Sequence, residues 1–212
     1  MASIPQELSS FDFASLKPHP GRLLSEDEFL AWCDEDVRAE WVDGEVIVMS
    51  PASWVHAKLS RLLIGLLGNF VETKKLGEVV GTEFTVRLNS NRRRIPDVLF
   101  IANDRLPNLQ PKHLEGAPNL IIEVVSDDSV DRDWRTKYQE YEASGVDEYW
   151  IVDPLDQRLE AYAAGDDKTY QRIVPHAGKV ASGVVPGFYL RPEWLWQQPL
   201  PTVQELLCEL LA

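Results

Sequence analysis

Two carboxylates stand in apolar stretches where a charged side chain is costly to bury. Asp97 alternates onto the same strand face as Ile95 and Leu99, and Glu123 lies within the apolar run 120–125. An ionised carboxylate in such a place needs a metal, another cation or a proton. Two simpler explanations stay open: Asp97 can bond a turn or a nearby arginine, and Glu123 can belong to a buried structural ion pair.

If both carboxylates point into one cleft from neighbouring strands, they suit Mg²⁺ or Mn²⁺, which are hard cations that prefer oxygen ligands. Such a metal lowers the pKa of water and neutralises charge that develops on a phosphate. The pair Asp97 and Glu123 therefore predicts a metal site for phosphodiester hydrolysis, with both residues as metal ligands and catalytic groups.

A set of short motifs carries a family resemblance. Pro96-Asp97 followed by Glu123-Val124-Val125 resembles the Pro-Asp…(Asp/Glu)-x-Lys signature of the restriction-endonuclease-like superfamily. A wider set is similar to the Uma2 (DUF820) family of endonucleases: Glu40-Trp41-Val42-Asp43-Gly44-Glu45, Met49-Ser50-Pro51, His56, Pro96-Asp97-Val98, Glu123-Val124-Val125-Ser126, Lys137-Tyr138 and Tyr149-Trp150-Ile151-Val152-Asp153-Pro154. The resemblance implies an α/β fold, a mixed sheet flanked by helices, and Mg²⁺-dependent endonuclease activity on DNA.

One position departs from the superfamily signature. Val125 stands where the signature has a lysine on the same strand face as Glu123, and valine can neither polarise water nor bind phosphate. The family resembles superfamily members in which this lysine has moved to the next helix, where Lys137 is the candidate. Lys137 falls on one helical stripe with Trp134 and Tyr141, which should face the sheet. The alternative is a lysine at the border of the stripe, paired at the surface.

Three further residues are candidates for the same site. His56 lies along the edge of an apolar helix face and matches the histidine of the family, so it is a candidate base or phosphate contact; otherwise it is a core or capping residue. Glu40 resembles the family's glutamate before the Asp-Gly hairpin and is a candidate catalytic residue near the metal, with an exposed hairpin charge as the alternative. Glu83 alternates onto the polar face of its strand and ranks below Glu40.

Local patterns predict the elements that must position these residues. Ser25 and Glu28 form a capping-box spacing, Asp43-Gly44 indicates a hairpin turn, and apolar residues recur at three and four residues from Val55 to Phe70. The predicted elements are helix 26–33, hairpin 41–49, helix 55–70 closed by Gly77, strands 84–88, 95–101, 119–125 and 148–152, helix 131–144, strands 158–162 and 170–174, and helix 203–211. The strand 119–125 is almost entirely apolar, which predicts a central position in the sheet.

Composition limits the function classes. The chain has 212 residues, 44% of them hydrophobic, which suits one domain over 23–212 preceded by an irregular arm over 1–22. A net charge of −13 argues against a basic nucleic-acid-binding surface and favours, as the alternative function, a catalytically silent binding or regulatory module. The dense basic cluster 92–94 is a candidate phosphate contact, although a charged run in a hairpin loop is usually solvated.

Partners and location follow from the remaining features. No run of eighteen apolar residues and no secretory leader is visible, so we expect a soluble, cytoplasmic protein without a membrane partner. The C-terminal strands and helix 203–211 could form a subunit interface, which predicts a homo-oligomer and most simply a dimer. Trp54 and Tyr149 could stack on bases, but packing in the core is the more ordinary role of such residues.

Overall fold

The computed structural model describes residues 19–34, 37–126 and 132–212. Most of the predicted arm, 1–22, and the first residue of the predicted helix 131–144 lie outside the described residues. The elements are α1 (Glu26–Trp32), β1 (Ala39–Val42), β2 (Glu45–Val48), α2 (Trp54–Lys74), β3 (Gly77–Gly81), β4 (Thr85–Asn89), β5 (Arg92–Arg94), β6 (Val98–Ala102), a 3-10 turn (Leu106–Asn108), β7 (His113–Glu115), β8 (Leu120–Val124), a π-helical turn (Arg132–Thr136), α3 (Lys137–Ser144), β9 (Glu148–Asp153), β10 (Arg158–Ala164), β11 (Tyr170–Arg172), β12 (Val180–Ala181), β13 (Tyr189–Leu190), α4 (Pro192–Leu195) and α5 (Val203–Leu211).

A mixed six-stranded sheet forms the centre of the molecule, in the order β11-β10-β9-β8-β6-β3. Strand β8 pairs in parallel with β9 and antiparallel with β6. Every residue of β8 is buried, because helices cover both faces of the sheet at this point. The predicted central position of this strand is confirmed, and so is the predicted fold class of a mixed sheet flanked by helices.

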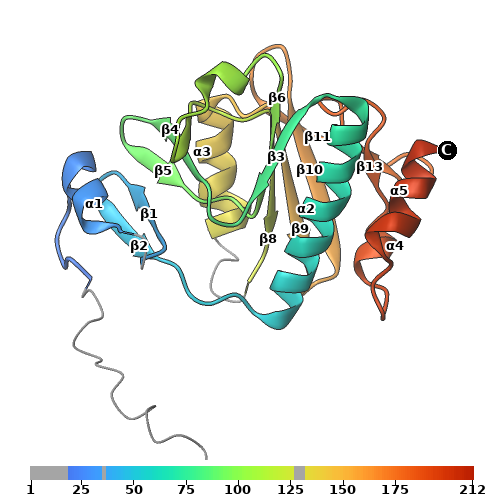
Figure 1. The fold of residues 1–212 in the computed structure, drawn as a ribbon, viewed down its shortest axis with the longest axis horizontal. Helices are drawn as coiled ribbons and strands as arrows, with labels where there is room; N and C mark the ends of the chain where they lie inside the picture. Colours follow the sequence, from blue (N-terminus) through green and yellow to red (C-terminus); the bar gives the residue numbers. More distant parts are fainter. Residues whose placement is uncertain (1–18, 35–36, 127–131) are drawn as a thin grey trace, which may run out of the picture.

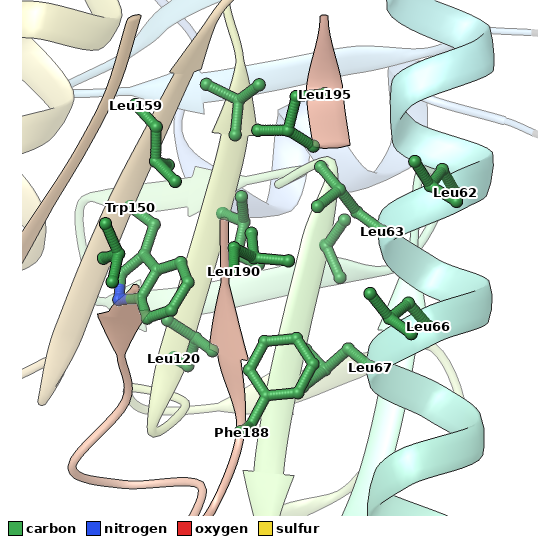
Figure 2. Packing of buried hydrophobic residues seen from close by; sticks show 14 of the residues in the cluster. Leu62, Leu63, Leu66, Leu67, Leu120, Trp150, Leu159, Phe188, Leu190 and Leu195 are labelled. Atoms are coloured by element: carbon green, nitrogen blue, oxygen red, sulfur yellow. The ribbon is translucent and has the colours of Figure 1, made fainter. Parts of the chain in front are cut away.

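Helix α2 covers one face of the sheet (Figure 1). Its leucines point at Leu120 and Trp150 of the sheet, and Phe188, just before β13, and Leu190 of β13 complete the cluster (Figure 2). Burying one such side chain contributes about 1.5–3 kcal/mol, so this face anchors α2 firmly. The apolar residues of α2 in this cluster are Leu59, Leu62, Leu63, Leu66, Leu67, Phe70 and Val71.

Helix α3 packs on the opposite face, where the odd-numbered residues of β8 point. Tyr141 of α3 and Tyr149 of β9 stack edge to face with ring centroids 5.0 Å apart, among Leu99, Ile121 and other buried residues. The predicted helix 131–144 is thus present, but it begins as a π-helical turn before α3. It ends at Gly145 as predicted, because this glycine adopts a left-handed φ of 80°.

The structure contains a second sheet, which the sequence patterns did not predict as a separate sheet. It has five strands in the order β2-β1-β5-β4-β7, and the predicted Asp-Gly hairpin forms its edge. The predicted strand 95–101 begins later than expected, at Val98, as β6 of the first sheet, and residues 92–94 before it form β5 of the second sheet. Pro96 separates the two strands, because it has no N–H to continue a ladder.

Two local predictions about glycine and charge were wrong. Gly77 does not close α2; Lys75 does so with a φ of 55°, and Gly77 opens strand β3. Glycine is required there because a Cβ would lie 2.0 Å from the carbonyl oxygen of Ile101. Glu83 is exposed in the turn between β3 and β4, rather than on the polar face of a strand.

Capping boxes begin the first and the last helix of the described part of the chain. Ser25 and Glu28 form the predicted capping box of α1. Helix α5 matches its predicted bounds, and a second capping box links Thr202 and Glu205. Leu206 of α5 is buried in the cluster beneath α2, so this helix uses its apolar face inside the chain. No helix among the described residues has the length and apolarity that a membrane crossing needs.

Candidate active site

The register of two strands brings the carboxylates together. Val98 of β6 pairs with Ile122 of β8, so Asp97, one position before β6, lies beside Glu123. Asp97 Oδ2 accepts a hydrogen bond of 2.8 Å from the backbone N–H of Val124. Both carboxylates are buried. Asp97 therefore bonds a strand backbone and a histidine, rather than an arginine or a turn.

The histidine is His56, from the first turn of α2. Its Nε2 lies 3.0 Å from Asp97 Oδ2, and Nδ1 lies 3.4 Å from the hydroxyl of Ser60. Burial by itself lowers the pKa of His56, but the hydrogen bond to Asp97 and the charges of Asp97 and Glu123 outweigh it, so the pKa is raised. The charge of Arg38 opposes this rise. His56 thus faces the carboxylates rather than the apolar core.

Lys137 occupies the first turn of α3 and reaches Glu123. Its Nζ lies 2.8 Å from Glu123 Oε1 and 3.1 Å from Asp133 Oδ1. Tyr141 donates a further hydrogen bond of 2.7 Å to Glu123 Oε1. The side chain of Lys137 is only 3% exposed, so it points inward from the predicted stripe and is not a surface lysine. Val125 packs in the apolar cluster below α3.

The electrostatic setting of Glu123 is unusual. Burial raises its pKa, the ammonium of Lys137 opposes the rise, and the charges of Asp97 and Asp133 add to it, so the pKa is about 8. Burial opposes the charge of Lys137, but Glu123, Asp133 and Glu40 keep the pKa of this lysine above its ordinary value. Burial is thus the main reason why Glu123 keeps its proton to a higher pH than an exposed glutamate does.

Glu40 lies in β1, at the wall of the same site, and is buried rather than exposed in its hairpin. Its Oε2 accepts from Arg94 at 2.6 Å, and its Oε1 accepts from the backbone N–H of Ile95 at 3.0 Å. Burial raises the pKa of Glu40, but Lys137, Arg94 and the Ile95 N–H outweigh it and lower the pKa. Glu40 therefore carries a charge that the protein itself satisfies.

The arginine cluster is not the solvated loop that its sequence indicated. Arg94 is buried and bonds Glu140 of α3 through two nitrogens, in addition to Glu40. Arg93 bonds Glu26 at 2.7 Å, and Arg92 bonds Asp43 at 2.9 Å. These pairings tie β5 to its neighbours. The candidate phosphate contacts 92–94 are thus engaged inside the protein.

The two aromatic candidates have different surroundings. Tyr149 is fully buried in β9, and its hydroxyl donates to the backbone carbonyl of Asp133 at 2.9 Å, which excludes stacking on a base. Trp54 is 77% exposed at the start of α2, with the ammonium of Lys58 5.9 Å from the ring centroid. Packing in the core therefore explains the aromatic side chain at Tyr149, but it does not explain the exposed side chain of Trp54.

A small pocket opens beside these groups, with a volume of about 70 Å³. Its lining includes Asp97, His56 and Glu40. The remaining lining residues are Arg38, Ile47, Val48, Met49, Ser50, Pro51, Ala52, Ser126 and Arg132. In the described part of the chain, no group of three or more His, Cys, Asp or Glu side chains is arranged to hold a metal. Any metal here would rest on the carboxylate pair.

Several residues of the site were missed by reasoning from the sequence. Asp133 and Tyr141 lie four residues before and after Lys137, and this helical spacing was the available signal. Arg38 and Arg132 border the pocket but stand alone in the sequence, without a pattern that marks them. Their position depends on the fold.

The architecture defines the class of protein: a mixed sheet between helices, with carboxylates at the ends of adjacent strands, is restriction-endonuclease-like. A crystal structure of "a putative nuclease belonging to DUF820 from Anabaena variabilis ATCC 29413" shares this fold, with a TM-score of 0.67, 17% identity, and coverage of 82% of this chain and 97% of that chain. The model of the Uma2 family, "Putative restriction endonuclease", matches residues 26–193. The chain belongs to this family, as its motifs predicted. No curated protein matches the chain.

Proposed function

We propose that this protein is a metal-dependent endonuclease that hydrolyses phosphodiester bonds in DNA at the site of Asp97 and Glu123. The observation that carries the proposal is the meeting of these two buried carboxylates at the ends of adjacent strands, with Lys137 Nζ 2.8 Å from Glu123. Buried carboxylates of this kind, beside a pocket, are typical of catalytic sites. Membership of the Uma2 family supports the same reading.

The carboxylate pair fits a hard divalent cation. Within the described ranges, no residue bonds Oδ1 of Asp97 or Oε2 of Glu123, so each carboxylate keeps one oxygen for a ligand. Burial raises the pKa of Glu123, with a further contribution from the charges of Asp97 and Asp133, and a bound cation would favour the ionised carboxylate. When bound, Mg²⁺ or Mn²⁺ supplies a Lewis acid that acidifies water and neutralises charge on the phosphate.

In this proposal, Lys137 performs the role of the lysine that the superfamily signature places on the strand, at the position of Val125. Its Nζ contacts Glu123 from the helix side, so an ammonium stands at the site although Val125 occupies the strand position. The contact holds the Glu123 side chain in one orientation, with help from the Tyr141 hydroxyl. The same ammonium can orient a water or a phosphate oxygen.

His56 and Glu40 have supporting parts. His56 bonds Asp97 through Nε2 and borders the pocket, so it orients Asp97 and can accept or hold a proton there. Both oxygens of Glu40 accept bonds from the protein, which favours a positioning role over metal binding. Through Arg94, Glu40 is linked to Glu140, which lies on the same helix as Lys137.

A cleavage screen tests the proposal. Purified protein is incubated with double-stranded, single-stranded and branched DNA in Mg²⁺, Mn²⁺ or EDTA. We expect cleavage that requires a divalent metal and is lost in Asp97→Asn and Glu123→Gln, with unchanged circular dichroism. Glu78→Gln is the matched control, because it removes an exposed carboxylate from the edge strand β3 of the same sheet. Failure of the folded, metal-loaded protein to cut any substrate would count against the proposal.

A catalytically silent binding or regulatory module is the second candidate, and the valine at position 125 favours it. Titration calorimetry with Mn²⁺ separates the two functions. A nuclease site should bind Mn²⁺ saturably and lose that binding in Asp97→Asn. A silent module should bind the ion weakly or not at all. A homodimer is part of the nuclease proposal, since one site cuts one strand and two copies would supply a site for each strand of a duplex, and light scattering measures the oligomeric state directly.

A further inference from the structure

Two arginines beside the carboxylate pair differ from the other arginines around it. Arg38 and Arg132 both line the pocket that contains Asp97 and His56. Nε and Nη2 of Arg38 and Nε of Arg132 are buried, and they have no hydrogen-bond acceptor among the described residues. Neither side chain forms an ion pair in that part of the chain. Buried donors of this kind are rare in native proteins, because each one forgoes its bond to water.

The neighbouring arginines do have partners. Arg94 bonds two buried carboxylates, and Arg87 and Arg93 share Glu26. Carboxylates are abundant in this chain, yet among residues 19–34, 37–126 and 132–212 none forms an ion pair with Arg38 or Arg132. Glu40 lines the same pocket, but its oxygens are taken by Arg94 and Ile95. The two guanidinium groups thus bring positive charge to the lining of the pocket, while their unbonded N–H groups are covered by neighbouring atoms.

The two arginines come from different parts of the fold. Arg38 precedes β1, and its carbonyl accepts a bond of 3.0 Å from Met49, which closes the open end of the hairpin. Arg132 begins the π-helical turn that leads to Asp133 and Lys137. One guanidinium is therefore held by the hairpin and the other by the segment before α3, and both line the pocket with Asp97 and His56.

We propose that Arg38 and Arg132 form a clamp for a backbone phosphate of DNA, and this inference rests on the nuclease function proposed above. A guanidinium group matches the geometry of phosphate oxygens and can bond two of them at once. The pocket suits a phosphate better than a base, since its volume of about 70 Å³ is far below the roughly 300 Å³ of a small ligand pocket. The clamp contacts the charged phosphate group and not the bases, so binding should not depend on base sequence.

The test measures binding separately from cleavage. Fluorescence anisotropy follows two labelled duplexes of unrelated sequence, and a single strand, in Ca²⁺ over a series of salt concentrations, with a gel to check for products. The variants are Arg38→Gln, Arg132→Gln and the charge-conserving Arg38→Lys. Arg172→Gln is the matched control, because it removes an exposed arginine from edge strand β11. Thermal unfolding verifies that each variant is folded.

We expect each glutamine variant to weaken binding by roughly 10-fold to 100-fold, equally for both duplexes, and to lower the slope of log Kd against log salt by about 1. Arg38→Lys should keep the salt slope and lose part of the affinity, since the charge remains and the two-oxygen contact does not. The control should bind as the unmodified protein does.

The outcomes separate this inference from the proposed activity. If the unmodified protein binds no DNA, or the glutamine variants bind with unchanged affinity and salt slope, the clamp is refuted, whether or not DNA is cut. If the glutamine variants lose binding while the unmodified protein never cleaves in Mg²⁺ or Mn²⁺, the clamp stands and the nuclease activity fails. A loss that differs between the two duplexes would contradict a contact to phosphate alone.

Discussion

Metal affinity at the carboxylate pair should rise steeply with pH, because a proton competes with the cation for Glu123. The pKa of Glu123 is raised to about 8 by burial and by its neighbouring carboxylates. A raised pKa means that the proton stays on the folded protein below that pH. At about pH 6 roughly one molecule in a hundred has this carboxylate ionised, and at about pH 8 roughly half do. A ligand carboxylate must be ionised to bind metal.

The magnitude follows directly from those fractions. Between about pH 6 and pH 8 the apparent affinity for Mn²⁺ should increase by roughly one to two orders of magnitude. Binding near pH 7 should release close to one proton. Titration calorimetry at several pH values gives the affinity, and repeating it in two buffers with different ionisation enthalpies counts the protons.

Two results would refute this reasoning. The first is an affinity for Mn²⁺ that stays flat between pH 6 and 8, since a Glu123 that is already ionised would leave no proton to displace. The second is a Glu123→Gln variant that keeps the full pH dependence, which would assign it to another group. His56 is the relevant neighbour, because its pKa is also raised and its positive charge would repel metal at low pH. His56→Gln therefore serves as the companion variant.

Three further outcomes are expected. Lys137→Met should cost about 3–5 kcal/mol in urea unfolding followed by tryptophan fluorescence, because it removes the cation that buried Glu123 and Asp133 share, and the double variant with Glu123→Gln should recover part of that loss. Arg94→Met should cost a similar 3–5 kcal/mol, whereas Arg92→Met, at a more exposed pair, should cost less than about 1 kcal/mol. Tyr141→Phe removes a donor to Glu123, so it should raise the pKa of that carboxyl further and move the pH profile of Mn²⁺ binding upward.

Much of the fold could be predicted because local patterns specify local structure. The capping box of α1, the Asp-Gly hairpin and the apolar period of α2 each report contacts within a few residues, and the structure follows them closely. The wrong predictions concern positions whose structure depends on contacts with segments that are distant in the sequence. Gly77 is needed by the approach of β6, which no neighbouring residue reveals. The division into two sheets at Pro96 depends likewise on which strands meet.

The residues of the candidate site show the same difference between local and long-range structure. The sequence by itself determined that Asp97 and Glu123 lie in apolar strands, and that Lys137 lies on the inward stripe of a helix, because strand alternation and helical spacing are local. Only the tertiary structure decided that Lys137 meets Glu123 and that His56 meets Asp97.

The positive charges of the site depended on the fold most of all. The arginine run 92–94 was conspicuous in the sequence, yet Glu26, Glu40, Glu140 and Asp43 bond it within the protein. Isolated Arg38 and Arg132 instead face the pocket. Residue type determines which charges a chain carries, but ion pairing acts through space between distant segments. Which arginines remain available to a phosphate is therefore a property of the packed structure alone.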